Sequence, residues 1–158
     1  MQPEHKNSPS IVVRRARPEE AGVIAAITDA AYARYVPQLG RKPQPMTADY
    51  IDKIAHHSVW LLFAGQTPAG ALTLEHEPDQ LYIYSVAVHP DQQKKGYGRT
   101  LLALAEQEAR DHGYRRIRLF TNAIMVENIA LYLRLGYVET GREPYLGSTL
   151  VHMAKALD

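Results

Sequence analysis

Residues 86–99 read Val-Ala-Val-His-Pro-Asp-Gln-Gln-Lys-Lys-Gly-Tyr-Gly-Arg, and this is the most informative stretch of the chain. An apolar strand leads into a glycine loop, and the loop opens a strongly amphipathic helix. Backbone N–H groups converge at such a helix start, and the helix dipole adds partial positive charge. Gly96 and Gly98 let the backbone approach a ligand without an intervening Cβ. Together with the lysines and the arginine beside them, they predict a site for a phosphorylated ligand.

Two common nucleotide-binding patterns do not fit this loop. In the dinucleotide pattern G-x-G-x-x-G, Leu101 occupies the position of the third glycine. The triphosphate pattern G-x-x-x-x-G-K-[ST] is absent, because Thr100 follows Arg99 rather than a Gly-Lys pair. The loop therefore belongs to a different class of phosphate-binding turn.

Hydrophobic periodicity and turn residues predict alternating strands and helices along the rest of the chain. The expected strands cover residues 11–16, 59–64, 69–77, 81–88, 115–121, 137–141 and 150–154. The expected helices cover residues 18–34, a short segment capped by Thr47, 98–112 and 124–135. Residues 36–47 contain three prolines and are expected to form a long loop. Residues 1–10 are expected to be a flexible tail, which leaves one domain over residues 11–158.

Composition and charge narrow the class of protein. The chain has 158 residues, enough for one domain with a sizeable core. A net charge of +1 gives no reason to expect a nucleic acid or an acidic membrane as partner. The absence of cysteine excludes disulfides, thiolate metal sites and a cysteine nucleophile. No metal site is predicted.

No apolar stretch approaches the roughly 18 residues that a membrane span needs. Residues 1–6 also lack the apolar core of a signal peptide. We therefore expect a cytoplasmic protein.

The segment Gln93-Lys94-Lys95-Gly96-Tyr97-Gly98 resembles the acetyl-CoA signature [QR]-x-x-G-x-[GA] of the GNAT N-acetyltransferase superfamily. Residues 81–98 resemble the fourth strand and pyrophosphate loop of that family throughout. The next strand and helix of the family are matched by Thr121, Asn122, Asn128, Ala130, Tyr132, Leu135, Gly136 and Tyr137, with Ala130 one position early. The resemblance spans residues 81–142, and over residues 11–80 it rests on element order alone.

The resemblance implies an α/β (α+β) GNAT fold. Its mixed central sheet would have six to seven strands, of which the fourth and fifth splay apart, with about four flanking helices. The pantetheine arm of acetyl-CoA would lie between the splayed strands, and the loop N–H groups would hold the pyrophosphate. The implied cofactor-binding residues are Val86, Ala87, Val88, Gln93, Lys94, Lys95, Gly96, Tyr97, Gly98, Arg99 and Asn128.

Tyr132 would be the catalytic residue, since the resemblance implies that it protonates the leaving thiolate. Asn128 and Tyr132 are four residues apart and share one helix face, and a tyrosine is a hydrogen-bond donor at neutral pH. An amphipathic core position is the alternative for Tyr132. For Asn128 the alternative is a solvated or capping side chain.

The acceptor side is less defined by the sequence. The family often places its acceptor-binding lid in the long loop, where Tyr32, Tyr35, Arg41 and Lys42 lie in or near the segment. The positive charge of Arg41 and Lys42 suggests an acceptor that carries a carboxylate.

Two strand residues are further candidates on the acceptor side. Glu75 is expected opposite Tyr82 and could take the proton of the amine, or lie on a solvated strand face. Tyr84 could line the acceptor pocket or simply pack.

These residues imply an N-acetyltransferase that moves an acetyl group from acetyl-CoA to an amine of a small molecule or protein by direct attack. A non-catalytic acyl-CoA-binding or sensing module on the same fold is the alternative, since a fold does not guarantee its chemistry. An unrelated phosphate-binding protein is a third reading. A homodimer is also expected, whereas the identity of the amine stays open.

Overall fold

The computed structural model describes residues 9–158. Most of the expected tail, residues 1–8, lies outside the described residues. Ser10 accepts a hydrogen bond from the Gly65 N–H at 2.8 Å, so the end of the predicted tail is tied to a strand turn.

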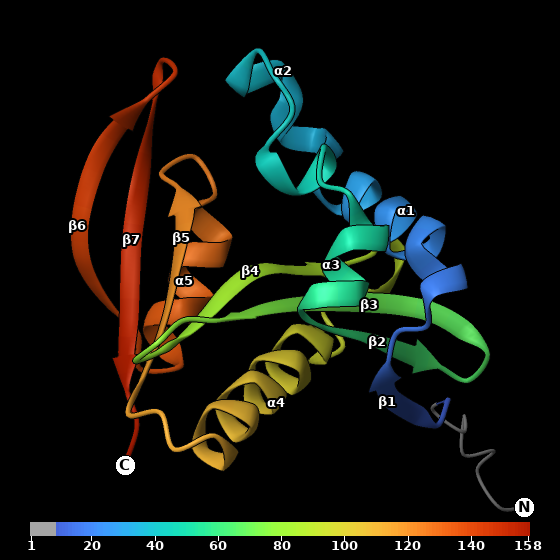
Figure 1. The fold of residues 1–158 in the computed structure, drawn as a ribbon. Helices are drawn as coiled ribbons and strands as arrows, with labels where there is room; N and C mark the ends of the chain where they lie inside the picture. The colour runs from blue at the N-terminus through green and yellow to red at the C-terminus, as the bar shows by residue number, and fades with distance from the viewer. Residues whose placement is uncertain (1–8) are drawn as a thin grey trace, which may run out of the picture.

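A single mixed sheet forms the centre of the molecule (Figure 1). In the described chain its order is β1-β2-β3-β4-β5-β7-β6, and only the β4–β5 pair is parallel. The strands are β1 (Ile11–Arg15), β2 (Ser58–Ala64), β3 (Thr67–His76), β4 (Leu81–Val88), β5 (Arg116–Asn122), β6 (Val138–Tyr145) and β7 (Ser148–Ala156). This arrangement confirms the predicted fold class.

The helices agree with the sequence prediction except in one region. They are α1 (Ala21–Tyr32), α2 (Val36–Leu39), α3 (Tyr50–His56), α4 (Tyr97–Asp111) and α5 (Val126–Arg134). The predicted loop over residues 36–47 is wrong in part, because α2 and a 3₁₀ turn over Gln44–Met46 lie inside it. Proline is tolerated there since it occupies the first turn of each element.

The predicted N-cap of α3 is also wrong. Asp49 caps this helix, and its carboxylate accepts a hydrogen bond from the Asp52 N–H at 3.1 Å. Thr47 instead closes the preceding 3₁₀ turn, where its hydroxyl donates to the Gln44 carbonyl at 3.1 Å. Threonine and aspartate both favour the N-cap position. Asp49 caps α3 because the preceding 3₁₀ turn ends at Thr47.

Alternation along the strands divides the core into two layers. Leu62 and Leu72 belong to the cluster that packs with α4, whereas their neighbours Leu61 and Ala71 belong to the cluster that packs with α1 and α3. Successive strand residues point to opposite faces, so one apolar run serves both layers. The sheet is therefore covered on both faces, with α4 on one side and α1 and α3 on the other. None of the helices in residues 9–158 combines the length and hydrophobicity that a membrane crossing requires.

The strands β4 and β5 splay apart, as predicted. Their parallel pairing is limited to Leu81 with Ile117 and Tyr82 with Arg118. Just beyond this point the register of β4 against β3 shifts, and Tyr84 is the extra residue of a bulge. Bulges bend a strand and increase its twist. Figure 1 shows β4 and β5 diverging from this point.

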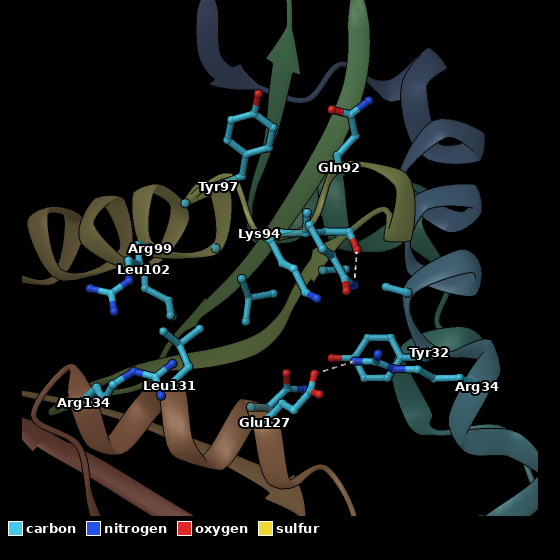
Figure 2. Close-up of a pocket in the computed structure, with 18 of the residues that line it drawn as sticks. Tyr32, Arg34, Gln92, Lys94, Tyr97, Arg99, Leu102, Glu127, Leu131 and Arg134 are labelled. Atoms are coloured by element: carbon cyan, nitrogen blue, oxygen red, sulfur yellow. Dashed lines mark hydrogen bonds and ion pairs between the residues drawn. The ribbon is translucent and has the colours of Figure 1, made fainter. Parts of the chain in front are cut away.

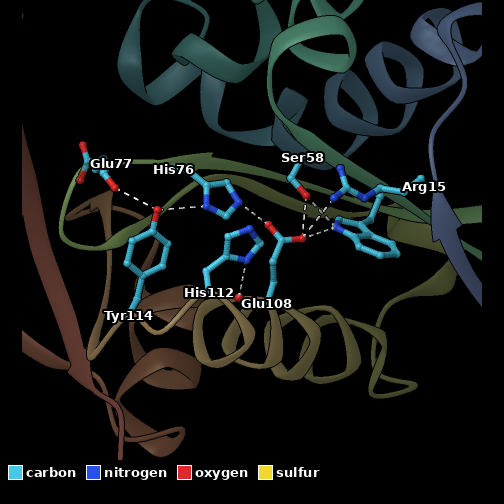
Figure 3. Close-up of polar contacts among 8 residues, drawn as sticks. Arg15, Ser58, His76, Glu77, Glu108, His112 and Tyr114 are labelled. Atoms are coloured by element: carbon cyan, nitrogen blue, oxygen red, sulfur yellow. Dashed lines mark hydrogen bonds and ion pairs between the residues drawn. The ribbon is translucent and has the colours of Figure 1, made fainter.

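A buried carboxylate links α4 to the sheet (Figure 3). Glu108 is 7% exposed and accepts hydrogen bonds from the Ser58 hydroxyl at 2.7 Å and the Trp60 indole at 3.1 Å. Its other oxygen lies 2.8 Å from Nε2 of His76. Burial alone would raise the pKa of Glu108. The hydrogen bonds from Ser58, His76 and Trp60 and the charge of Arg15 outweigh it and hold the pKa below its usual range.

We predict that Glu108→Ala destabilises the fold by roughly 2–4 kcal/mol, because the buried Ser58 hydroxyl, the half-buried Trp60 indole and His76 lose their partner at once. Chemical unfolding at pH 7 measures this loss. Gln107→Ala is the matched control: this exposed neighbour on the same helix should change stability by no more than about 0.5 kcal/mol.

The stability that the Glu108 carboxylate contributes should depend on pH. Since the folded pKa of Glu108 is depressed, its charge contributes stability above the unfolded value of about 4.3, and the contribution is lost as pH falls through the folded pKa. The stability difference between wild type and Glu108→Ala should therefore shrink at about pH 3. An equal difference at both pH values would contradict this account.

Candidate functional site

Beyond Tyr82, no strand pairs with the backbone of β4 on the side that faces the gap. The His89 N–H donates to the Ala69 carbonyl at 2.9 Å, which shows that odd-numbered residues at this end bond to β3. Because hydrogen bonding alternates along an antiparallel pair, the N–H and C=O groups of Val86 and Val88 point toward β5. There the ladder has already ended. A ligand with amide groups can therefore bind along β4 as an added strand.

The glycine loop turns this strand edge into a helix start. Gly96 is the N-cap of α4 with φ of 83°, and Lys94 also has a positive φ, at 64°. Tyr97 is 7% exposed and packs in the core beneath the loop. The loop is thus anchored from below, and its N–H groups face outward at the positive end of the helix. The Gln93 amide closes the loop by donating to the Val88 carbonyl at 3.2 Å.

A cavity of about 300 Å³ runs between these groups and α5 (Figure 2). Its walls come from α1, β4, the glycine loop and α5. It contains the predicted cofactor-binding residues Val86, Ala87, Val88, Gln93, Lys94, Gly96, Tyr97, Gly98, Arg99 and Asn128. Lys95 does not line it, and its ammonium donates to the Gln92 side chain at 3.2 Å.

Two arginines of this cavity were missed by the sequence analysis. Arg34, just after α1, and Arg134, in the last turn of α5, line it beside Lys94 and Arg99. Only one acidic side chain joins them in the lining, Glu127, so the cavity is strongly positive. A 3.8 Å ion pair between Arg34 and Glu127 spans its mouth (Figure 2). The signal for Arg134 was present in the sequence, since it follows Glu127 by two helical turns.

A second, smaller cavity of about 70 Å³ lies on the α2 side of the gap. Tyr32 lines both cavities, so the two meet at its side chain. The full lining of the second cavity is Tyr32, Leu39, Arg41, Pro43, Gln44, Pro45, Tyr84, Phe120, Thr121, Asn122, Met125, Tyr145 and Leu150.

Long-range hydrogen bonds hold this cavity together. The Arg41 guanidinium donates to the Ser148 hydroxyl at 3.1 Å and to the Tyr145 carbonyl at 3.4 Å. The Gln44 amide donates to the Tyr145 hydroxyl at 3.2 Å. The segment before α3 is thereby tied to the β6–β7 hairpin across the splayed strands.

The predicted acceptor-side residues separate into those that line the second cavity and those that do not. Arg41 and Tyr84 line it with Tyr32, whereas Tyr35 lines the first cavity. Lys42 is exposed and lines neither of the two.

Glu75 lies opposite Tyr82 as expected but lines neither cavity. Its carboxylate accepts a 2.8 Å hydrogen bond from the Lys53 ammonium, which also lies 4.0 Å from the centre of the Tyr84 ring. The charge of Glu75 is therefore already paired.

Tyr132 is a core residue in this structure and lines neither cavity. It is 7% exposed, and its ring centre lies 5.8 Å from that of Tyr137. Burial first, and the phenols of Tyr32, Tyr137 and Tyr35 second, raise the pKa of Tyr132 above its usual range. Its hydroxyl therefore stays protonated at neutral pH. Burial likewise raises the pKa of Tyr32, to about 12.

Comparison with known protein families and sequences finds similarity over most of the fold. A family model described as the acetyltransferase (GNAT) family matches residues 24–137. N-acetyltransferase 8F1 of Rattus norvegicus is 29% identical over 103 residues, which cover 61% of this chain and 46% of that protein. The L-amino acid N-acyltransferase MnaT of Escherichia coli is 38% identical over 65 residues, 41% of this chain and 38% of that protein. The chain spans less than half the length of these relatives.

Solved structures share the fold at low sequence identity. The PaiA N-acetyltransferase of Thermoplasma acidophilum, in complex with coenzyme A, superposes with a TM-score of 0.77 at 18% identity, covering 93% of this chain and 99% of that one. The YncA protein of Salmonella typhimurium, solved with acetyl-CoA, gives 0.73 at 22% identity, covering 94% and 95%.

Substitution by alanine should lower the stability of the protein at Gly96 and should not lower it at Gly98. Gly96→Ala forces a side chain into the left-handed region and should cost roughly 1–2 kcal/mol. A Cβ on Gly98 would lie 3.8 Å from Leu131, an ordinary contact, and alanine favours the helix there. Gly98→Ala should therefore be neutral or stabilising by up to about 1 kcal/mol. Urea unfolding of both variants measures this difference, and a clear destabilisation by Gly98→Ala would refute it.

Proposed function

Because the chain belongs to the acetyltransferase (GNAT) family, we propose that it transfers an acetyl group from acetyl-CoA to an amine by direct attack. One observation carries the proposal. The edge of β4 that no strand covers is followed, after a 3₁₀ turn over Pro90–Gln92, by the glycine loop and the positive start of α4, and all three line one cavity. Such a surface suits a ligand that has an amide-containing arm at one end and phosphates at the other.

The residues present fit acetyl-CoA at both ends. The N–H groups from Lys94 to Arg99 would hold the pyrophosphate, and the basic side chains of the cavity would neutralise the remaining phosphate charge. Val86 and Val88 would pair with the pantetheine arm, with Asn128 as a side-chain partner from α5. The thioester would then lie toward Tyr32, where the two cavities meet.

The second cavity would bring the amine to the same point. The nitrogen of the neutral amine forms a bond to the thioester carbonyl carbon and the carbon–sulfur bond breaks. The nitrogen gives up one proton to solvent water, and the departing thiolate takes one proton. A backbone N–H near Val88 would stabilise the charge on the carbonyl oxygen. Tyr132 is the proposed donor of the proton, because a tyrosine hydroxyl is a donor at neutral pH.

The alternative function is a non-catalytic acyl-CoA-binding module, and the observation in its favour is that Tyr132 is buried and is not among the residues that line either cavity. Release of free thiol from acetyl-CoA in the presence of an amine panel separates the two functions. Turnover with at least one amine supports transfer, whereas tight binding without any turnover supports the module.

Three proposals concern the context of the reaction. We propose that residues 11–158 act as one N-acetyltransferase domain and that the protein works in the cytoplasm. We also propose a homodimer, because β6 is an edge strand that is exposed along most of its length. Cell fractionation and analytical ultracentrifugation test the last two.

Gly98→Val should weaken acetyl-CoA strongly and keep the fold. The new side chain would project toward Leu131 and Val88, across the space proposed for the cofactor. We expect the Michaelis constant for acetyl-CoA to rise by at least tenfold, measured together with its dissociation constant by calorimetry. Gly141→Val is the control, since this exposed glycine of β6 has open space around it. Unchanged calorimetric affinity in folded Gly98→Val would contradict the assignment.

Tyr132→Phe tests the proton donor. The ring and its packing remain, so the stability and the affinity for acetyl-CoA should change little. Loss of a general acid typically costs about 10²- to 10⁴-fold. We expect roughly tenfold to a few hundredfold, because a thiolate with a thiol pKa of about 8.5 is already a fair leaving group. Wild-type turnover under conditions where chemistry limits the rate would show that water or another residue supplies the proton.

A further inference from the structure

The second cavity contains one cationic side chain whose hydrogen-bonding capacity is only partly used. The Nε atom of Arg41 is buried and has no hydrogen-bond partner in the part of the chain that the structure describes. The contacts to Ser148 and Tyr145 both come from a single terminal nitrogen, Nη2. None of the ion pairs among residues 9–158 involves Arg41. A buried Nε–H without an acceptor is an unsatisfied hydrogen-bond donor.

Other charges near the splayed strands are already neutralised. Lys53 pairs with Glu75 at 2.8 Å, and Arg118 pairs with Glu77 through two hydrogen bonds of 2.7 and 2.6 Å. Arg41 is therefore the cationic side chain of the second cavity, and no carboxylate among residues 9–158 pairs with it, although its guanidinium also lies 4.9 Å from the centre of the Tyr145 ring. A guanidinium binds a carboxylate with matched, charge-assisted hydrogen bonds.

The rest of the cavity suits an apolar group. Phe120, Met125, Leu150 and Leu39 line it together with two prolines of the 40–46 segment. No aspartate or glutamate lines it. A second ammonium group, such as that of a polyamine, would therefore have no counter-ion there and would pay for its desolvation.

From these observations we propose that the acceptor is a free α-amino acid with an apolar side chain, whose carboxylate is bound by Arg41. The proposal rests on the proposed transferase function and names the acceptor of that same site. The apolar walls would hold the side chain, and the α-amino group would face Tyr32, which the cavity shares with the cofactor side. The amino terminus of a peptide fits less well, because its first carbonyl carries no charge for Arg41.

Substrate comparison tests the carboxylate directly. Thiol release from acetyl-CoA would be measured with L-leucine, L-methionine and L-phenylalanine, each beside its amide, and with glycine and spermidine. We expect kcat/KM for at least one of the three acids to exceed that for its amide by roughly tenfold to a hundredfold, the usual worth of a hydrogen bond to a charged group. Glycine and spermidine should be poorer than that acid.

Variants test the residue. Arg41→Gln should raise the Michaelis constant of the acid by roughly tenfold to a hundredfold, leave that of acetyl-CoA unchanged and bring the acid-to-amide ratio close to one. Arg142→Gln is the matched control, because this arginine lies exposed on β6 and pairs only with Glu139. Ser148→Ala removes a partner of Arg41 and keeps its charge, so it should retain the preference for the acid. A loss of that preference in Ser148→Ala equal to the loss in Arg41→Gln would assign the effect to the hairpin and overturn the proposal.

The outcomes separate this inference from the proposed function. Equal or better turnover of amides, glycine or spermidine would overturn the amino-acid acceptor and leave the transferase intact. Tight acetyl-CoA binding without thiol release for any amine would overturn both. Preference for the acid that disappears in Arg41→Gln and survives in Arg142→Gln would support both.

Discussion

The separation of β4 from β5 leaves most of the backbone of β4 without a neighbouring strand on one side. Two neighbouring parallel strands would normally satisfy each other's backbone groups along their whole length. Here the pairing ends at Tyr82, and the bulge at Tyr84 bends β4 away. The following N–H and C=O groups need partners from elsewhere. Since the same strand continues into the start of α4, one stretch of backbone offers both a strand edge and an anion site.

The sequence was informative where the pattern is local. The boundaries of β4 were predicted without error and those of α4 to within one residue, because an apolar run, a glycine loop and an amphipathic helix follow one another directly. Glu75 was correctly placed opposite Tyr82, since the strand period and a short turn determine that register. Ten of the eleven residues predicted to bind the cofactor line the larger cavity.

Features that depend on tertiary packing could not be predicted from the sequence pattern. Tyr132 and Asn128 share a helix side in the pattern, yet Asn128 lines the cavity and Tyr132 packs beside Tyr137. The difference arises because the first cavity and the core meet along α5, and only the packing decides which side chain faces which. Arg41 and Lys42 were indistinguishable as neighbours in a basic segment. The β6–β7 hairpin, about a hundred residues away, gives them different surroundings.

The two cavities differ in how far apart their walls lie along the chain, and this has a consequence for evolution. The phosphate-binding end is built largely from neighbouring segments, whereas the Arg41–Ser148 contact joins residues 107 positions apart. The 40–46 segment and the tip of the β6–β7 hairpin contribute no core strand pairing of β3, β4 or β5. Substitutions there can reshape the smaller cavity while the grip on the larger ligand stays as it is. A lineage with this architecture can therefore acquire a new acceptor through changes at the periphery and keep its acyl donor.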